Sequence, residues 1–80
     1  METSDKISEF IASQILHNNA NRPGLDEPLL EGGILDSAGI FSLVTYLEEE
    51  FGISVDDDEI VVENFDTVGS ITRMVTDKLA

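Results

Sequence analysis

Asp36 and Ser37 lie where a long loop leads into the most clearly amphipathic segment of the chain. A serine in the first turn of a helix is accessible to a modifying enzyme. A phosphodiester on its hydroxyl would lie among the free N–H groups of the helix start, where the helix dipole stabilises an anion. Asp and Ser are also ordinary helix-capping residues, and the local pattern alone favours that simpler interpretation. The sequence therefore offers Ser37 as a candidate site of covalent modification, with capping as the alternative.

The other reactive side chains do not form a catalytic or metal-binding motif. His17 is the only histidine, and Ser37 lacks the G-x-S-x-G setting of a hydrolase nucleophile. The chain has no cysteine, and so no thiolate zinc site and no cysteine nucleophile. The acidic run from Asp56 to Glu59 departs from an EF-hand twice, with Val61 where Gly is needed and Thr67 where Glu is needed. We therefore predict no catalytic residue and no metal site, and interpret the acidic run as a solvated turn.

The net charge of −13 disfavours nucleic acid and membrane surfaces as partners. No Lys or Arg occurs between Arg22 and Arg73, whereas thirteen Asp and Glu residues do. Such a surface repels phosphate backbones and anionic lipid, and it attracts proteins with basic patches and speeds their encounter. A purely solubilising surface is the alternative. We predict protein partners, no nucleic acid and no membrane insertion, and we expect a monomer.

The sequence predicts no targeting segment and no membrane-spanning segment. No run of apolar residues is long enough to span a bilayer. The first residues are polar and acidic, unlike the basic start and apolar block of a signal peptide. We therefore expect a soluble, cytoplasmic protein.

Apolar residues at helical spacing predict an all-α fold: a small four-helix bundle with three main helices, one short helix and a long first loop. The first helix is expected from a cap at Thr3 or Ser4 to about Asn18. The second is expected to follow an N-cap at Asp36 and to end at Gly52 in a left-handed conformation. Together the elements predict a single domain over residues 1–80.

The remaining segments are expected to complete this bundle. Residues 60–62 indicate a short helix or a strand-like piece, which their β-branched side chains alone do not decide. Asp66 or Thr67 caps a last helix that runs to Leu79. The first loop extends from about residue 19 to residue 35. Five of its apolar residues are expected on the core: Leu25, Leu29, Leu30, Ile34 and Leu35.

Three motifs spread along the chain resemble those of the acyl carrier protein superfamily. They are Leu35-Asp36-Ser37, then Leu47-Glu48-Glu49-Glu50-Phe51-Gly52-Ile53, then Glu63-Asn64-Phe65-Asp66-Thr67-Val68. A D-S dipeptide alone is a weak signal, but these motifs at these separations are specific. The resemblance covers essentially all 80 residues.

The resemblance implies a carrier that is not itself an enzyme. By match, Ser37 receives 4′-phosphopantetheine from coenzyme A through a magnesium-dependent phosphopantetheinyl transferase, and Asp36 contributes to recognition by that transferase. The terminal thiol of the arm then carries an acyl or aminoacyl group as a thioester. A chain without Cys is consistent with this, because the only thiol would be the one on the arm.

Two departures from many fatty-acid carriers concern the surface beside the arm. Those carriers follow Asp-Ser with Leu and then with acidic residues along the second helix, whereas Ala38 and Gly39 follow here. This pair is more similar to D-alanine carriers and stand-alone aminoacyl carriers. We expect partners to contact a small or apolar surface at Ala38, Gly39 and Phe41, with their basic residues near Glu48 and Glu49.

Three functions are compatible with these residues. The leading hypothesis is a stand-alone carrier that is loaded by an adenylating acyl or aminoacyl ligase and serves a downstream acyltransferase or synthase. A general acyl carrier of fatty-acid or polyketide synthesis is the alternative within this class. An acidic adaptor that binds a basic partner, with Ser37 unmodified, is the alternative outside it. For Phe41, a core position is the alternative to the partner-facing one.

Overall fold

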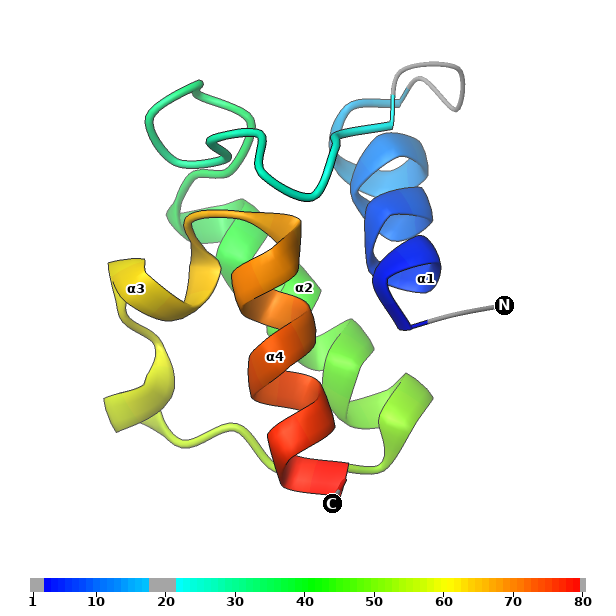
Figure 1. Cartoon of the computed structure of the whole chain (residues 1–80), viewed down its shortest axis with the longest axis vertical. Helices are drawn as coiled ribbons and strands as arrows, with labels where there is room; N and C mark the ends of the chain where they lie inside the picture. Colours follow the sequence, from blue (N-terminus) through cyan, green and yellow to red (C-terminus); the bar gives the residue numbers. More distant parts are fainter. Residues whose placement is uncertain (1–2, 18–21, 80) are drawn as a thin grey trace.

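The computed structural model describes residues 3–17 and 22–79, and its helices form a small four-helix bundle (Figure 1). The helices are α1 (Thr3–Phe10), α2 (Ser37–Phe51), α3 (Val62–Phe65) and α4 (Val68–Leu79). No strand occurs in the described part of the chain. Helix α4 contacts each of the other three helices. The prediction of three main helices, one short helix and a long first loop is confirmed.

Helix α1 continues as a π-helix over Ile11–Ile15, with Leu16 donating to the carbonyl of Ile11 at 2.9 Å. His17 follows with a left-handed backbone (φ 55°) and an exposed side chain. The helix thus ends before His17, whereas the sequence predicts an end at about Asn18. Asn18 itself lies outside the described residues. Thr3 and Ser4, which we expected as caps, belong to the first turn of α1 itself.

Helix α2 has the two ends that its sequence predicts. Asp36 is the N-cap, and its carboxylate accepts a hydrogen bond from the backbone N–H of Gly39 at 2.8 Å. Gly52 adopts φ 67° at the other end and donates to the carbonyl of Glu48 at 3.0 Å. Between them, Leu43, Val44 and Leu47 are buried.

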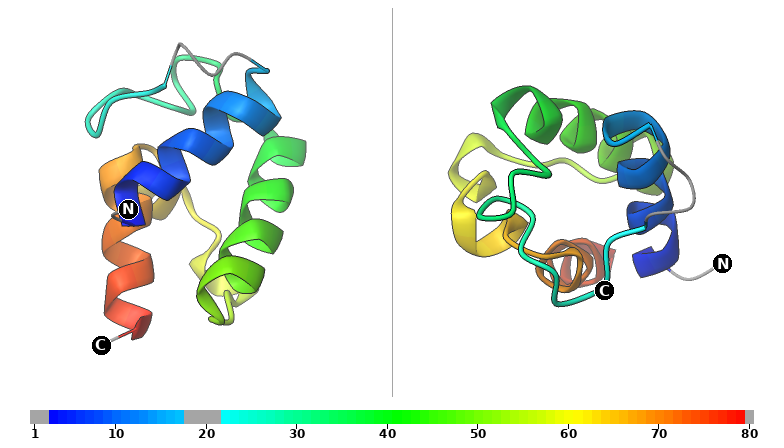
Figure 2. Two further views of the ribbon diagram at one scale, coloured as in Figure 1. Left: turned by 90° about the vertical axis from the view of Figure 1, so that its right-hand side faces the viewer. Right: turned by 90° about the horizontal axis from the view of Figure 1, so that it is seen from above.

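The first loop (cyan to green in Figure 2) covers one end of the bundle. Backbone hydrogen bonds connect it to the start of α4: Leu29 donates to Asp66 at 2.7 Å, and Gly69 donates to Leu25 at 3.0 Å. Leu29 and Leu35 are buried, as expected. The prediction for Leu25 is wrong, because its side chain is 54% exposed, although its carbonyl accepts from the N–H of Gly69.

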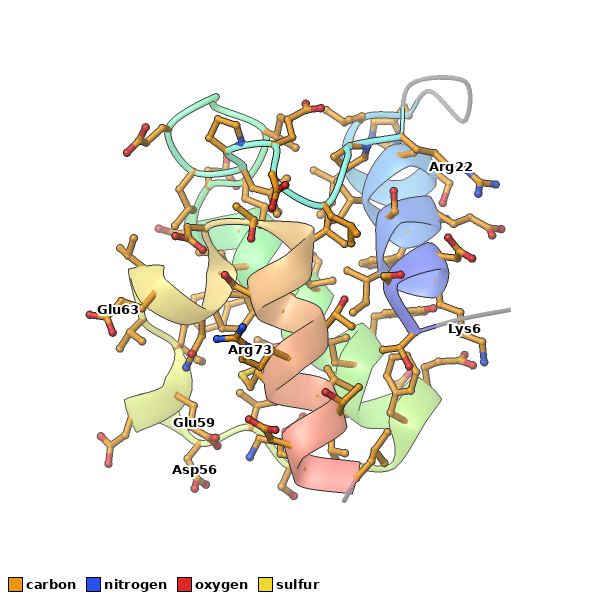
Figure 3. All side chains as sticks on the ribbon, in the orientation of Figure 1. Lys6, Arg22, Asp56, Glu59, Glu63 and Arg73 are labelled. Atoms are coloured by element: carbon orange, nitrogen blue, oxygen red, sulfur yellow. The ribbon has the colours of Figure 1, made fainter. Side chains whose placement is uncertain are left out.

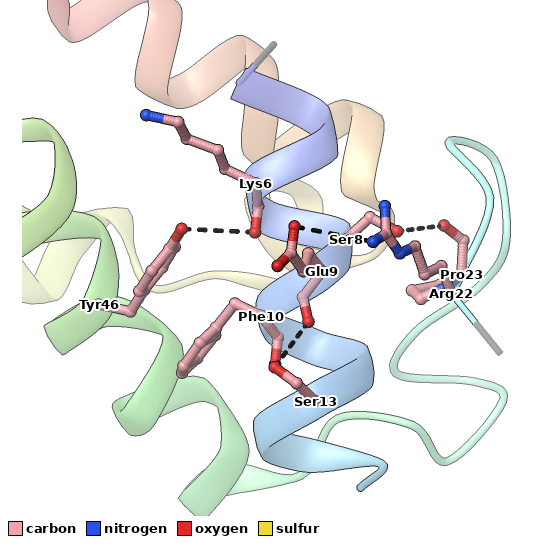
Figure 4. A network of polar contacts seen from close by, with 8 residues as sticks. All are labelled: Lys6, Ser8, Glu9, Phe10, Ser13, Arg22, Pro23 and Tyr46. Atoms are coloured by element: carbon pink, nitrogen blue, oxygen red, sulfur yellow. Dashed lines mark hydrogen bonds and ion pairs between the residues drawn. The ribbon is translucent and has the colours of Figure 1, made fainter. Parts of the chain in front are cut away.

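Helix α1 packs on α2 through aromatic side chains (Figure 4). Phe10 stacks on Tyr46 with ring centroids 4.3 Å apart, and Phe51 meets Tyr46 edge-on at 6.3 Å. Burial, followed by the nearby charges of Glu50 and Glu9, raises the pKa of Tyr46.

The buried hydroxyl of Ser8 donates to the carbonyl of Pro23 at 2.9 Å, which attaches the loop to α1.

The segment between α2 and α4 contains a 3-10 turn, Asp57–Glu59, and the four-residue helix α3. The β-branched segment that the sequence left open therefore leads into a short helix. Phe65 is the fully buried residue of α3. The hydroxyl of Thr67 accepts from the N–H of Ser70 at 3.0 Å, so Thr67 is the capping residue at the start of α4.

Candidate functional site

Ser37 is the first residue of α2, and its side chain is exposed. Asp36 directly before it is also exposed. The first backbone N–H groups of a helix have no intrahelical acceptor. Asp36 occupies only that of Gly39, and the N–H groups of Ser37 and Ala38 have no acceptor among the described residues. Ser37 thus lies beside free donors at the positive end of the helix dipole.

A groove of about 360 Å³ begins at Ser37 and lies between α2 and α3. Asp36 and Ser37 are its polar lining residues. The others are apolar: Leu30, Ile40, Ile60, Val61, Val62 and Phe65. Among the residues that the structure describes, no basic side chain lines it. A group attached to the hydroxyl of Ser37 would therefore start at the edge of an apolar surface.

Two of the apolar residues that line this groove are exposed: Val62 on α3 is 65% exposed and Val61 is 44% exposed. Phe41 on α2 is 63% exposed. The exposure of Phe41 removes the core alternative for this residue. The sequence does not predict Val61 and Val62 as surface residues, because three consecutive β-branched residues carry no periodicity that marks an outward face.

Comparison with known proteins shows to which family this arrangement belongs. The family model described as phosphopantetheine attachment site matches residues 7–75. A relative from Serratia sp. named "Probable acyl carrier protein PigG" is 42% identical over 72 residues, covering 88% of this chain and 80% of that protein. The chain belongs to the acyl carrier protein superfamily. Its prosthetic group is accordingly covalently attached 4′-phosphopantetheine.

Two further proteins are similar to this carrier. The "Acyl carrier protein homolog" of Mycoplasma genitalium is 41% identical over 56 residues, covering 70% of this chain and 66% of that protein. A chain from a solved structure described as "Crystal structure of FAD-dependent dehydrogenase" superposes with a TM-score of 0.77 at 29% identity. That match covers 85% of this carrier and 96% of the other chain. Proteins of this superfamily interact with a phosphopantetheinyl transferase and with synthases or ligases, and they are carriers rather than catalysts.

The acidic residues at the end of α2 are engaged to different degrees in this carrier. The carboxylate of Glu48 accepts from the N–H of Val55 at 2.9 Å, and Glu50 pairs with Lys6 at 3.1 Å. Glu49 is exposed and has no ion-pair partner within the described ranges. The predicted partner-binding acids are thus brought together at one helix end, but Glu48 also holds the following loop in place.

Ala38 and Gly39 differ in their surroundings although they are adjacent. Ala38 is exposed, whereas Gly39 is half-buried. A Cβ on Gly39 would approach Leu35 Cδ2 at 3.3 Å and Asp36 Oδ1 at 3.4 Å. The absence of a side chain at Gly39 therefore lets the loop end pack closely on the first turn of α2.

In the described part of the carrier, no helix is long and apolar enough to cross a membrane.

Proposed function

We propose that Ser37 is the attachment residue of this carrier and that the arm on it tethers acyl or aminoacyl groups as thioesters. The observation that carries the proposal is the exposed Ser37 hydroxyl at the first residue of α2, next to N–H donors that have no acceptor within residues 3–17 and 22–79. The oxygens of a phosphodiester on Ser37 would accept hydrogen bonds from those N–H groups, so the start of α2 fits the phosphate of phosphopantetheine. The arm supplies a flexible thiol, and this chain supplies its attachment point and the surface that partners recognise.

The test is intact mass after incubation with coenzyme A, magnesium and a phosphopantetheinyl transferase. The wild-type chain gains the mass of one phosphopantetheine group, and Ser37→Ala gains none. Circular dichroism is the control, because an exposed side chain can be replaced without loss of helicity. Ser42→Ala, an exposed serine further along α2, is the matched variant and is modified like the wild type. An unchanged wild-type mass favours the unmodified acidic adaptor, and a mass gain in Ser37→Ala places the attachment elsewhere.

We further propose that an adenylating ligase loads this carrier, with the small Ala38-Gly39 pair after Ser37 as the supporting feature. The two curated relatives are both named as acyl carriers, which supports an acyl cargo over an aminoacyl one. Loading trials with matched acyl and amino acids and a purified adenylating ligase separate the two cargo classes. Loading only through an acyltransferase of fatty-acid synthesis favours the general acyl carrier instead.

The surface for these partners is proposed to be divided. Ala38, Gly39 and Phe41 supply the small or apolar part near Ser37, and Glu48 and Glu49 supply the charged part at the far end of α2. Glu49→Lys is expected to lower the loading rate and its salt dependence, because charges accelerate encounter. Phe41→Ala is expected to raise the KM for the carrier, because buried contacts control dissociation. Loading that neither substitution alters contradicts this surface.

An FAD-dependent dehydrogenase is a second partner class that we propose. The similar chain comes from the structure whose description names that enzyme. The match covers 96% of that chain but only 85% of this one, so that chain is the shorter of the two and has the size of a carrier. The corresponding test incubates the loaded carrier with a purified dehydrogenase of this type and follows the mass of the tethered group. A loss of two hydrogens supports the partnership, and an unchanged mass contradicts it.

A further inference from the structure

Helix α3 forms one wall of the groove beside Ser37, yet few side chains support it. It is four residues long, and its one fully buried side chain is Phe65, whereas Val61 and Val62 are exposed. A second cavity of about 470 Å³ borders its other side and is lined in part by Glu63 and Asn64. Phe65 anchors α3 in the core, and surface depressions border the segment on both sides, so polar contacts contribute to its position.

Glu59, directly before this segment, connects it to α4. Its Oε1 accepts from Lys78 Nζ at 2.6 Å and from the N–H of Asp56 at 3.0 Å. Its backbone carbonyl accepts from Nδ2 of Asn64, a residue of α3, at 2.8 Å. One residue therefore links the last turn of α4, the 3-10 turn and α3 (Glu59 and Asp56 are labelled in Figure 3).

The Lys78–Glu59 pair is also the least exposed ion pair in the described part of the chain. Its side chains are 21% and 31% exposed, against 36% and 39% for Lys6 and Glu50. The pair between Arg22 and Glu9 is longer and more exposed still. Ion pairs that are partly withdrawn from water are screened less by salt, so this pair is the one best able to hold a segment in place.

We propose that Lys78 and Glu59 are positioning residues that hold α3, and with it Val61 and Val62, beside Ser37 for the enzymes that act there. Neither side chain lines the groove itself, and both act through α3. This inference rests on the proposed function of Ser37.

The first test is hydrogen exchange of residues 57–65 in Lys78→Gln. Exchange in this segment is expected to rise roughly two- to fivefold, the range that the energy of a partly exposed ion pair permits. Lys6→Gln is the matched control, because it removes the same charge and breaks the Lys6–Glu50 pair on the other side of the molecule. It is expected to leave exchange of this segment unchanged. Equal exchange in the two variants overturns the proposal.

The second test separates positioning from general stability by the kinetics of modification. With a phosphopantetheinyl transferase, Lys78→Gln is expected to raise the KM for the carrier roughly two- to fivefold with little change in kcat. Lys78→Arg can still pair with Glu59 and is expected to restore the wild-type KM. A KM that equals the wild-type value in Lys78→Gln overturns the positioning role. A wild-type chain that gains no mass refutes the proposed function instead, and hydrogen exchange still tests the link between α4 and α3.

Discussion

The carboxylate of Asp36 and the backbone N–H of Gly39 are joined by a hydrogen bond of 2.8 Å, which holds the residue before Ser37 against the turn that follows it. Asp36 is thereby a structural cap, and its other carboxylate oxygen is available to a partner. Capping and recognition by a transferase are compatible roles for one side chain.

The cap predicts a difference between two substitutions of Asp36. Asp36→Ala removes the hydrogen-bond acceptor and is expected to lower the free energy of unfolding by about 0.5–2 kcal/mol. Asp36→Asn is expected to keep most of the stabilisation by the cap, because its amide oxygen can still accept. Urea unfolding measures this. If the charge of Asp36 also contributes to recognition by the transferase, the Asp36→Asn carrier is modified more slowly although it remains as stably folded. Modification of Asp36→Asn at the wild-type rate would show that the charge has no such role.

Gly32 is predicted to tolerate no side chain. A Cβ there would lie 2.5 Å from the carbonyl oxygen of Pro28, so the loop backbone must shift. Gly32→Ala is expected to cost about 1–3 kcal/mol of unfolding free energy, the usual range for overpacking. Gly24 lies in the same loop with open space around it, and Gly24→Ala is the matched control. Equal unfolding midpoints for the two variants would contradict this account.

Phe41 and Phe65 are predicted to respond oppositely to truncation. Phe65 is fully buried, and Phe65→Ala is expected to cost about 3–5 kcal/mol. Phe41 is mostly exposed, so Phe41→Ala is expected to change the unfolding free energy by no more than about 0.5 kcal/mol. Thermal or urea unfolding of both variants checks this. A large loss of stability in Phe41→Ala would mean that the ring is buried in solution.

Glu59 is predicted to contribute a pH-dependent part of the stability. The hydrogen bond from Lys78, followed by that from the N–H of Asp56, lowers its pKa below the ordinary value of 4.5. A carboxylate with a lowered folded pKa stabilises the fold above its unfolded pKa and loses this effect as the pH falls through the folded pKa. The stability gap between wild type and Glu59→Gln is therefore expected to be full above pH 4.5 and to narrow below it.

A gap for Glu59→Gln that stays constant from neutral pH to about pH 3 would contradict the assigned pKa direction.

Salt is predicted to stabilise the fold. A net charge of −13 on 80 residues implies self-repulsion, to which the acidic runs 48–50 and 56–59 contribute. Salt screens such repulsion over a Debye length of about 10 Å at 0.1 M. The melting temperature is therefore expected to rise from low to moderate salt in a calorimetric series. A flat or falling melting temperature would show that the acidic groups are already well separated.

The sequence alone determined the parts of this protein whose signals are local. The cap at Asp36, the left-handed residue at Gly52 and the spacing of Leu43, Val44 and Leu47 defined α2, because each acts within a few residues of chain. The position of Ser37 at the start of that helix followed from the same signals. The motifs around these residues were also sufficient to indicate the superfamily.

Only the tertiary structure decided how segments far apart in the chain meet. In the folded chain the side chains of Phe41 and Leu25 are exposed. Val61 and Val62 line the same groove as Ser37. The tertiary structure also gave Glu48 and Glu59 partners that are not adjacent to them, the N–H of Val55 and the ammonium of Lys78. An acidic side chain on a helix surface has the same local pattern whether it is free or engaged. Which state it adopts depends on the element that packs beside it, and local sequence carries no signal for that contact.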